Sequence, residues 1–185
     1  MIQLTAFALV SLDGFINDKN GKIAWHTPDE ETHQFMNELH ARFTDHIYNE
    51  TSYEIMKYWE NPPNLDSESQ VIQEYAHLWQ KTHKTVISKH LSGLDPAQYT
   101  IWPELTADAL SGLKKNASGN ILIGGPKLIA SAIDFRLLDK IDLMTVPVLL
   151  GGGESLFRDV PRTNLKLIET RSFSNGWVYS NYEIQ

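Results

Sequence analysis

Two adjacent glycines in the last third of the chain are suited to bringing backbone N–H groups against a phosphate. An apolar run, Ile121–Ile123, stops at Gly124–Gly125, and Pro126 follows in a position typical of a first helical turn. Adjacent glycines allow the backbone angles that close approach requires, and a helix N-terminus attracts anions. Because Pro126 has no N–H, the second glycine, Lys127 and Leu128 would be the donors. The pattern suggests a nucleotide cofactor, although a double glycine by itself is more often a tight strand-to-helix turn without a ligand.

A second glycine run, Gly151–Gly153, follows the apolar segment Val146–Leu150. It is not the Gly-x-Gly-x-x-Gly fingerprint that opens a helix in dinucleotide-binding folds. Two interpretations stay open. The run either forms a bulge or sharp bend at the end of a strand, or it lines an active-site cleft, with Gly152 as a candidate substrate contact.

Polar and aromatic residues near the N-terminus are further candidates. Asp13 follows an apolar strand and is either a carboxylate at the mouth of a cleft or part of an Asp-Gly turn. Trp25 either stacks on a flat ring or anchors the core. His33 and His40 lie seven residues apart, without the spacing of a helical metal pair, and are interpreted as surface residues. No metal site is predicted.

Apolar periodicity predicts strands that alternate with helices through most of the chain and strands alone at its end. The predicted strands cover 3–10, 46–48, 84–88, 99–102, 121–123, 139–150, 165–173 and 178–184. The predicted helices start near Pro28 and Pro126 and cover 51–58, 67–80 and 105–115. This order describes an α/β fold with a mostly parallel sheet and an antiparallel C-terminal edge. Residues 1–185 form one predicted domain.

Composition excludes several classes of protein. The net charge of −7 and the lack of a dense Lys/Arg cluster argue against a nucleic-acid partner. No apolar run approaches the length of about 20 residues that crosses a membrane. There is no cysteine, and the N-terminus lacks the pattern of a signal peptide. We therefore expect a cytoplasmic protein with a small-molecule substrate.

An ordered set of segments resembles a known family. The set is 11–16, 23–25, 53–54, 124–128 and 151–157, and it spans nearly the whole chain. Together these segments resemble the dihydrofolate-reductase-like family typified by the reductase domain of riboflavin biosynthesis, the RibD C-terminal domain. The resemblance implies a three-layer α/β/α fold, an NADPH-dependent reductase and a homodimer. It also implies a substrate like 5-amino-6-(5-phosphoribosylamino)uracil.

The resemblance implies roles for particular residues. Asp13 is the candidate proton source, and Asp29 and Glu30 are weak candidates for substrate contact. The residues expected to bind the cofactor come from the loops that follow the strands: Ser11, Gly14, Trp25, Ser52, Ser88, Lys89, Gly124, Gly125, Lys127 and Leu128.

The sequence departs from the family pattern at two places. Where the family carries a Gly-Arg pair, this chain has Asn49 and Glu50. A carboxylate repels a 2′-phosphate and suits a free ribose hydroxyl, so NADH use is possible in place of NADPH. The acidic residue expected before the glycine turn is replaced by Ile123.

Two alternatives to a riboflavin-type reductase remain. The first is a dihydrofolate reductase, which predicts a carboxylate at Asp29 or Glu30 facing the pterin ring. The second is a cofactor-binding or ligand-binding homologue without catalysis, which the changes at Glu50 and Ile123 favour. For the expected dimer, the apolar segment Leu143–Val146 is a candidate exposed edge.

Overall fold

The computed structural model describes residues 2–185. Eight strands form one sheet: β1 (Leu4–Ser11), β2 (Phe43–Asn49), β3 (His83–Ile87), β4 (Tyr99–Trp102), β5 (Asn120–Ile123), β6 (Lys140–Val146), β7 (Leu165–Ser172) and β8 (Val178–Ile184). The helical elements are α1 (Glu30–His40), α2 (Glu50–Met56), η1 (Lys57–Glu60), η2 (Leu65–Ser67), α3 (Gln70–Lys81), α4 (Ala107–Asn116) and α5 (Pro126–Asp134).

The sheet has the order β4-β3-β2-β5-β1-β6-β8-β7. The first six strands of this order pair in parallel, and β8 and β7 pair antiparallel at one end. The carboxyl ends of the parallel strands therefore meet along one edge of the sheet, which is where ligands bind in open α/β folds. The α/β class with an antiparallel C-terminal edge, predicted from the sequence, is confirmed.

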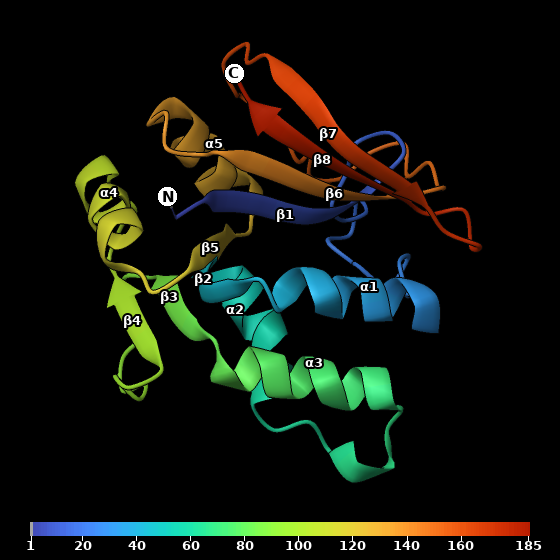
Figure 1. The fold of residues 1–185 in the computed structure, drawn as a ribbon, viewed down its shortest axis with the longest axis horizontal. Coiled ribbons are helices and arrows are strands. Elements are labelled where there is room, and N and C mark those ends of the chain that lie inside the picture. The colour runs from blue at the N-terminus through green and yellow to red at the C-terminus, as the bar shows by residue number, and fades with distance from the viewer. Residues whose placement is uncertain (1) are drawn as a thin grey trace.

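Side chains alternate between the two faces of the sheet, and a layer of helices packs against each face. Leu4 and Ala6 of β1 pack in one core cluster with residues of α4 and α5. Phe7 and Leu9 point to the opposite face, against the cluster that contains α1. A third, aromatic cluster joins α3 to β2 and β3. Figure 1 shows α1 and α3 running side by side across this second face. The three-layer prediction is therefore confirmed.

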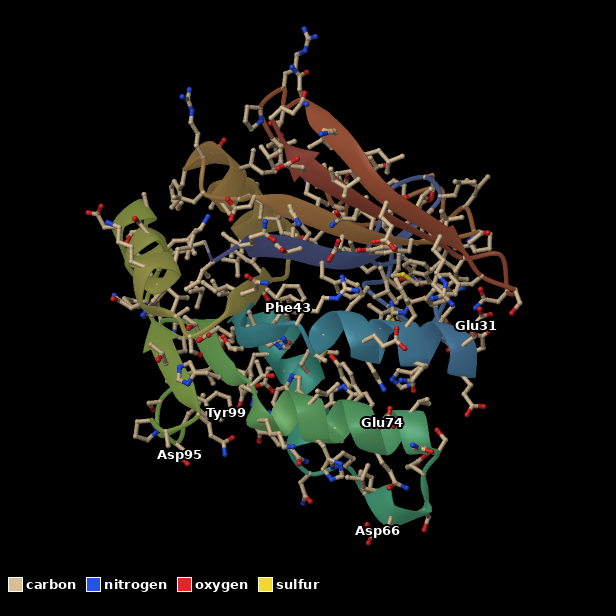
Figure 2. All side chains as sticks on the ribbon, viewed as in Figure 1. Glu31, Phe43, Asp66, Glu74, Asp95 and Tyr99 are labelled. Carbon is tan, nitrogen blue, oxygen red and sulfur yellow. The ribbon has the colours of Figure 1, made fainter. Side chains whose placement is uncertain are left out.

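Caps explain where α1 begins and how it is held. Asp29 lies in extended conformation and its carboxylate accepts from the Thr32 N–H at 2.9 Å, as an N-cap does. Glu31 accepts from the Ser174 hydroxyl at 2.8 Å, in the turn between β7 and β8. Figure 2 shows Glu31 at the end of α1 that faces this turn. The C-terminal hairpin thus fixes the start of the helix.

Two predictions about the strand near Val146 are wrong. The strand was expected over 139–150, but β6 ends at Val146 because Pro147 follows and has no N–H for the ladder. The segment Leu143–Val146 is not an edge, since β6 lies between β1 and β8. Met144 and Val146 are buried in the core. At this end of the sheet the edge strand is β7, which the hairpin places outside β8.

Candidate active site

The N-terminus of α5 opens at the carboxyl edge of the sheet. Gly125 is its N-cap, with φ +94°, and no side chain caps the helix. No hydrogen bond within residues 2–185 takes up the N–H groups of Lys127 and Leu128. Unpaired N–H groups and the helix dipole make this end a seat for an anion. The structure thus brings together the donors that the sequence indicated.

Close approach of β2 to β5 requires a glycine at position 125. A Cβ there would lie 2.9 Å from the Asn49 Nδ2 atom and 3.6 Å from the Ser52 hydroxyl oxygen. Asn49 is held in place because its side chain accepts from the Ser52 N–H at 2.7 Å and caps α2. The predicted cofactor contacts Ser52 and Gly125 therefore face each other across the same gap.

A carboxylate lies at the next strand end along the sheet. The Ser88 hydroxyl donates to Glu50 Oε2 at 2.7 Å. The same hydroxyl oxygen accepts from the N–H groups of His90 and Leu91 at 3.0 and 2.9 Å. Lys89 is exposed. Glu50 follows the end of β2 and Ser88 follows the end of β3. They thus form one polar corner beside the α5 N-terminus, since β2 pairs with both β3 and β5.

A cavity of about 520 Å³ extends from Gly124–Gly125 beneath the sheet. Its walls come from β1, α1, α2, η1 and α3. The side chains that define its interior are Phe7, His33, Met36, His40, Trp59 and Tyr75. Among the described residues, 2–185, no Lys, Arg, Asp or Glu lines it. This size and apolar character are typical of a small-molecule site.

The histidines of the cavity are uncharged at neutral pH. Burial lowers the pKa of His40 to about 4, and burial also lowers the pKa values of His26 and His33. Behind the wall, burial holds the pKa of His46 well below its usual range. Low local polarity disfavours the charged imidazole. The cavity is therefore electrically neutral as well as apolar.

His40 and His46 form a buried aromatic cluster. Their ring centroids lie 5.4 Å apart, and the His40 ring also lies 5.2 Å from that of Tyr75. The Tyr48 hydroxyl and His46 Nδ1 are 2.8 Å apart and share a hydrogen bond. His40 Nδ1 and His46 Nε2 have no partner within residues 2–185. The interpretation of His40 as a surface residue is wrong, because α1 turns it toward the sheet.

Asp13 joins two loops and does not line the cavity. Its carboxylate accepts from the Ser11 hydroxyl at 2.7 Å and from the N–H groups of Leu150 and Gly151 at 3.1 and 2.8 Å. The Ser11 hydrogen bond, followed by these N–H groups, holds the pKa of Asp13 below its ordinary value. An ionised carboxylate has no proton to donate. Its role as a proton source stays a prediction that these surroundings do not favour.

The loop that follows β1 packs closely against the Gly151–Gly153 run. A Cβ at Gly152 would lie 2.4 Å from Lys19 Cε, and one at Gly153 would lie 1.9 Å from the Asn17 carbonyl oxygen. None of the three glycines lines the cavity. Of the two interpretations left open, the one the structure supports is a bend that accepts a closely packed chain.

The remaining predicted residues have structural roles or lie at the rim. Trp25 packs against the α1 cluster, and its neighbour His26 lines the cavity. Gly14 has φ +89° and accepts from the Leu156 N–H at its carbonyl. Asp29 caps α1, and Glu30 is exposed. Neither carboxylate lines the cavity, so the structure does not place a pterin-facing acid where the dihydrofolate reductase alternative requires one.

The sequence did not identify the residues that build most of the cavity. His33, Met36 and His40 follow the i, i+3, i+7 spacing of one helical face, which could have indicated a shared surface on α1. Trp59 and Tyr75 join them from η1 and α3. Only the packing of α1 against α3 brings these segments together.

Within residues 2–185, no helix is long and apolar enough to cross a membrane. In the same residues, no three His, Asp or Glu side chains converge on a position suited to a metal ion.

Comparison with known proteins identifies a matching family model and several similar proteins. The family model described as the RibD C-terminal domain matches residues 3–179. The uncharacterized protein YyaP of Bacillus subtilis (strain 168) is 34% identical over 180 residues, which span 94% of this chain and 90% of that protein. A pyrimidine reductase-like protein from Corynebacterium diphtheriae has 17% identity and a TM-score of 0.73, with 100% of this chain and 92% of that chain covered.

The fold also matches a dihydrofolate reductase. The enzyme from Enterococcus faecalis, solved in complex with NADP(H), is similar over 99% of this chain and 96% of its own, with 14% identity and a TM-score of 0.66. The dihydrofolate-reductase-like fold predicted from the ordered segments is therefore confirmed.

Proposed function

Since the chain belongs to the RibD C-terminal domain family, we propose that it is a nicotinamide-dependent reductase that acts on a small heterocyclic or carbonyl compound. One observation carries the proposal. The uncapped N-terminus of α5, with the free N–H groups of Lys127 and Leu128, opens directly onto the neutral cavity. A phosphate seat beside an apolar ring-sized cavity fits a nicotinamide dinucleotide and its substrate.

The chain offers residues for each part of the cofactor. Gly125 leaves room for a diphosphate, and Lys127 and Leu128 donate their N–H groups to it. Ser52 faces the same gap, and Ser88 with Glu50 holds the ribose end. When bound, a reduced nicotinamide supplies a hydride to a substrate carbon and becomes oxidised, while a proton from solvent completes the reduction at the adjacent nitrogen or oxygen. The cavity positions the ring.

Gly125→Ala is expected to weaken cofactor binding by about tenfold or more, because the new Cβ would lie 2.9 Å from Asn49 Nδ2 and displace that side chain, and because the φ of +94° is strained for alanine. Fluorescence titration of NADPH and NADH measures the dissociation constants. Gly93→Ala is the matched control, since Gly93 has φ +77° and a Cβ there meets nothing within 4 Å. Equal loss in both variants would contradict the proposed diphosphate seat.

Tight binding without turnover of any carbonyl or heterocyclic compound would favour the non-catalytic alternative.

We propose that Glu50 removes the usual preference for NADPH over NADH. Its carboxylate at the Ser88 corner repels a 2′-phosphate and accepts from a free hydroxyl. Glu50→Gln is expected to shift the affinity ratio toward NADPH by about tenfold, measured by titrating both cofactors. Glu54→Gln, on the same helix with a half-exposed side chain, is the control and should leave the ratio unchanged. A tenfold NADPH preference in the unmodified protein would refute the proposal.

We also propose that two copies associate through β7. Its eight residues are all exposed, and Leu165, Leu167 and Ile168 are 42, 51 and 48% exposed. One side pairs with β8, and no strand within residues 2–185 pairs with the other. Such an apolar edge invites pairing.

Leu167→Lys is expected to convert the dimer to a monomer at micromolar concentration in light scattering, because a charge at this edge opposes pairing. Leu149→Lys, at a 71% exposed position outside the strands, is the control. A monomeric unmodified protein would contradict the dimer.

A further inference from the structure

Away from the α5 N-terminus, no charged side chain of residues 2–185 lines the cavity beside the proposed phosphate seat. In the part of the chain that the structure describes, no Lys or Arg lines it to pair with a phosphate, and no Asp or Glu lines it to pair with a cationic ring. The three histidines in its wall, His26, His33 and His40, all have pKa values lowered by burial. At neutral pH the wall therefore presents no formal charge.

A charged group that entered this cavity would lose more free energy of hydration than it gained from contacts with the wall. Moving an ion out of water is unfavourable unless a partner charge and hydrogen bonds replace its hydration. Here the polar side chains in the wall are few and uncharged, such as those of Ser52 and Thr27. They can orient one neutral carbonyl or ring nitrogen, but they cannot neutralise a phosphate dianion.

The shape of the wall favours a flat ring. Tyr75 lies with its ring centroid 4.7 Å from that of Trp59, and 5.2 Å from that of His40. Phe7 approaches the His40 ring from the sheet, at 4.9 Å. Aromatic groups arranged in this way pack against ring faces and edges. A volume of about 520 Å³ lies within the range of sites for small ligands.

We propose that the substrate is a neutral aromatic or conjugated ring compound that carries neither a phosphate nor a carboxylate. This inference rests on the proposed reductase function for the reaction, but the binding of the ring does not depend on the cofactor. It separates this chain from a reductase of phosphorylated ribosylamino-pyrimidines. The segments that could supply a counter-charge at the inner wall, α1 and α3, instead present Met36, Ile72 and Tyr75.

The test compares two probes that share a naphthalene ring and differ by a phosphate group, 1-naphthol and 1-naphthyl phosphate, by calorimetry without cofactor and with excess inorganic pyrophosphate to occupy the proposed diphosphate seat. We expect 1-naphthol to bind at least about tenfold more tightly. Equal or tighter binding of 1-naphthyl phosphate would overturn the inference. So would the failure of 1-naphthol to bind at about 1 mM. Because no cofactor is present, either result leaves the cofactor titrations to decide the reductase proposal separately.

A pair of variants tests whether the cavity wall sets this preference. Ile55 lines the cavity and is 48% exposed, so Ile55→Arg adds a charge at the mouth without emptying the core. It is expected to strengthen binding of 1-naphthyl phosphate by about tenfold. Tyr58→Arg adds the same charge three residues later, at a 47% exposed position that does not line the cavity. Its effect should be less than about threefold, because salt screens exposed charges. Equal effects in the two variants would overturn the inference.

Discussion

Gly153→Ala is expected to lower the free energy of unfolding by about 3 kcal/mol or more. The new Cβ would lie 1.9 Å from the carbonyl oxygen of Asn17, which is backbone and cannot rotate away. The φ of +142° adds strain for any residue with a Cβ. The clash can be relieved only if the loop after β1 moves away from Gly153. That movement would break the hydrogen bond from the Glu154 N–H to the Asn17 side chain, 2.9 Å long.

Urea unfolding at neutral pH measures this loss, and a neighbouring glycine provides the control. Gly151 has φ +65°, and a Cβ there meets nothing within 4 Å. Gly151→Ala should therefore lower the free energy of unfolding by only about 1–2 kcal/mol, because alanine is disfavoured in a left-handed conformation. If Gly153→Ala were no more destabilising than Gly151→Ala, the close seating of the two loops would be contradicted.

Acidification from pH 6.5 to pH 4 is expected to lower the free energy of unfolding by about 3 kcal/mol through His40 alone. In the unfolded chain this imidazole binds a proton near pH 6.5, whereas burial delays protonation in the folded chain to about pH 4. Between these values the unfolded state holds more protons, so stability falls as the pH falls. His46 acts in the same direction, because burial lowers its pKa too.

His40→Phe separates this contribution from the titration of carboxylates. Phenylalanine keeps the edge contacts that the His40 ring makes with Phe7 and Tyr75 but cannot bind a proton. Urea unfolding at several pH values should show that the variant loses about 3 kcal/mol less than the unmodified protein between pH 6.5 and pH 4. His77→Phe, at an exposed position, should leave the pH dependence unchanged. An unaltered dependence in His40→Phe would contradict the buried, neutral state of His40.

Most of the fold followed from local patterns. The strand Tyr99–Trp102 has the predicted bounds, and the helix after Gly124–Gly125 starts at Pro126 as expected. The C-terminal hairpin was also predicted, since two apolar runs flank the turn at Ser174–Gly176. Such features depend on neighbours in the chain, and the residue types record them directly.

The pairing of distant segments was harder to predict. The sequence indicated that Leu143–Val146 was apolar but not that β8 would cover its edge, because that pairing joins residues about forty positions apart. In the same way, Asp13 follows a strand end as expected. Its carboxylate also accepts from the Leu150 and Gly151 N–H groups. This contact could not be predicted, because it depends on where the second glycine loop lies.

The sequence by itself determined the alternation of strands and helices, the family, and the glycine turn that opens α5. These depend on backbone angles and apolar periodicity, which are local properties of residue type. Only the tertiary structure decided the character of the cavity. Phe7, His40, Trp59 and Tyr75 come from four elements that meet through packing. The neutral state of the histidines also depends on burial, and burial exists only once the distant segments have come together.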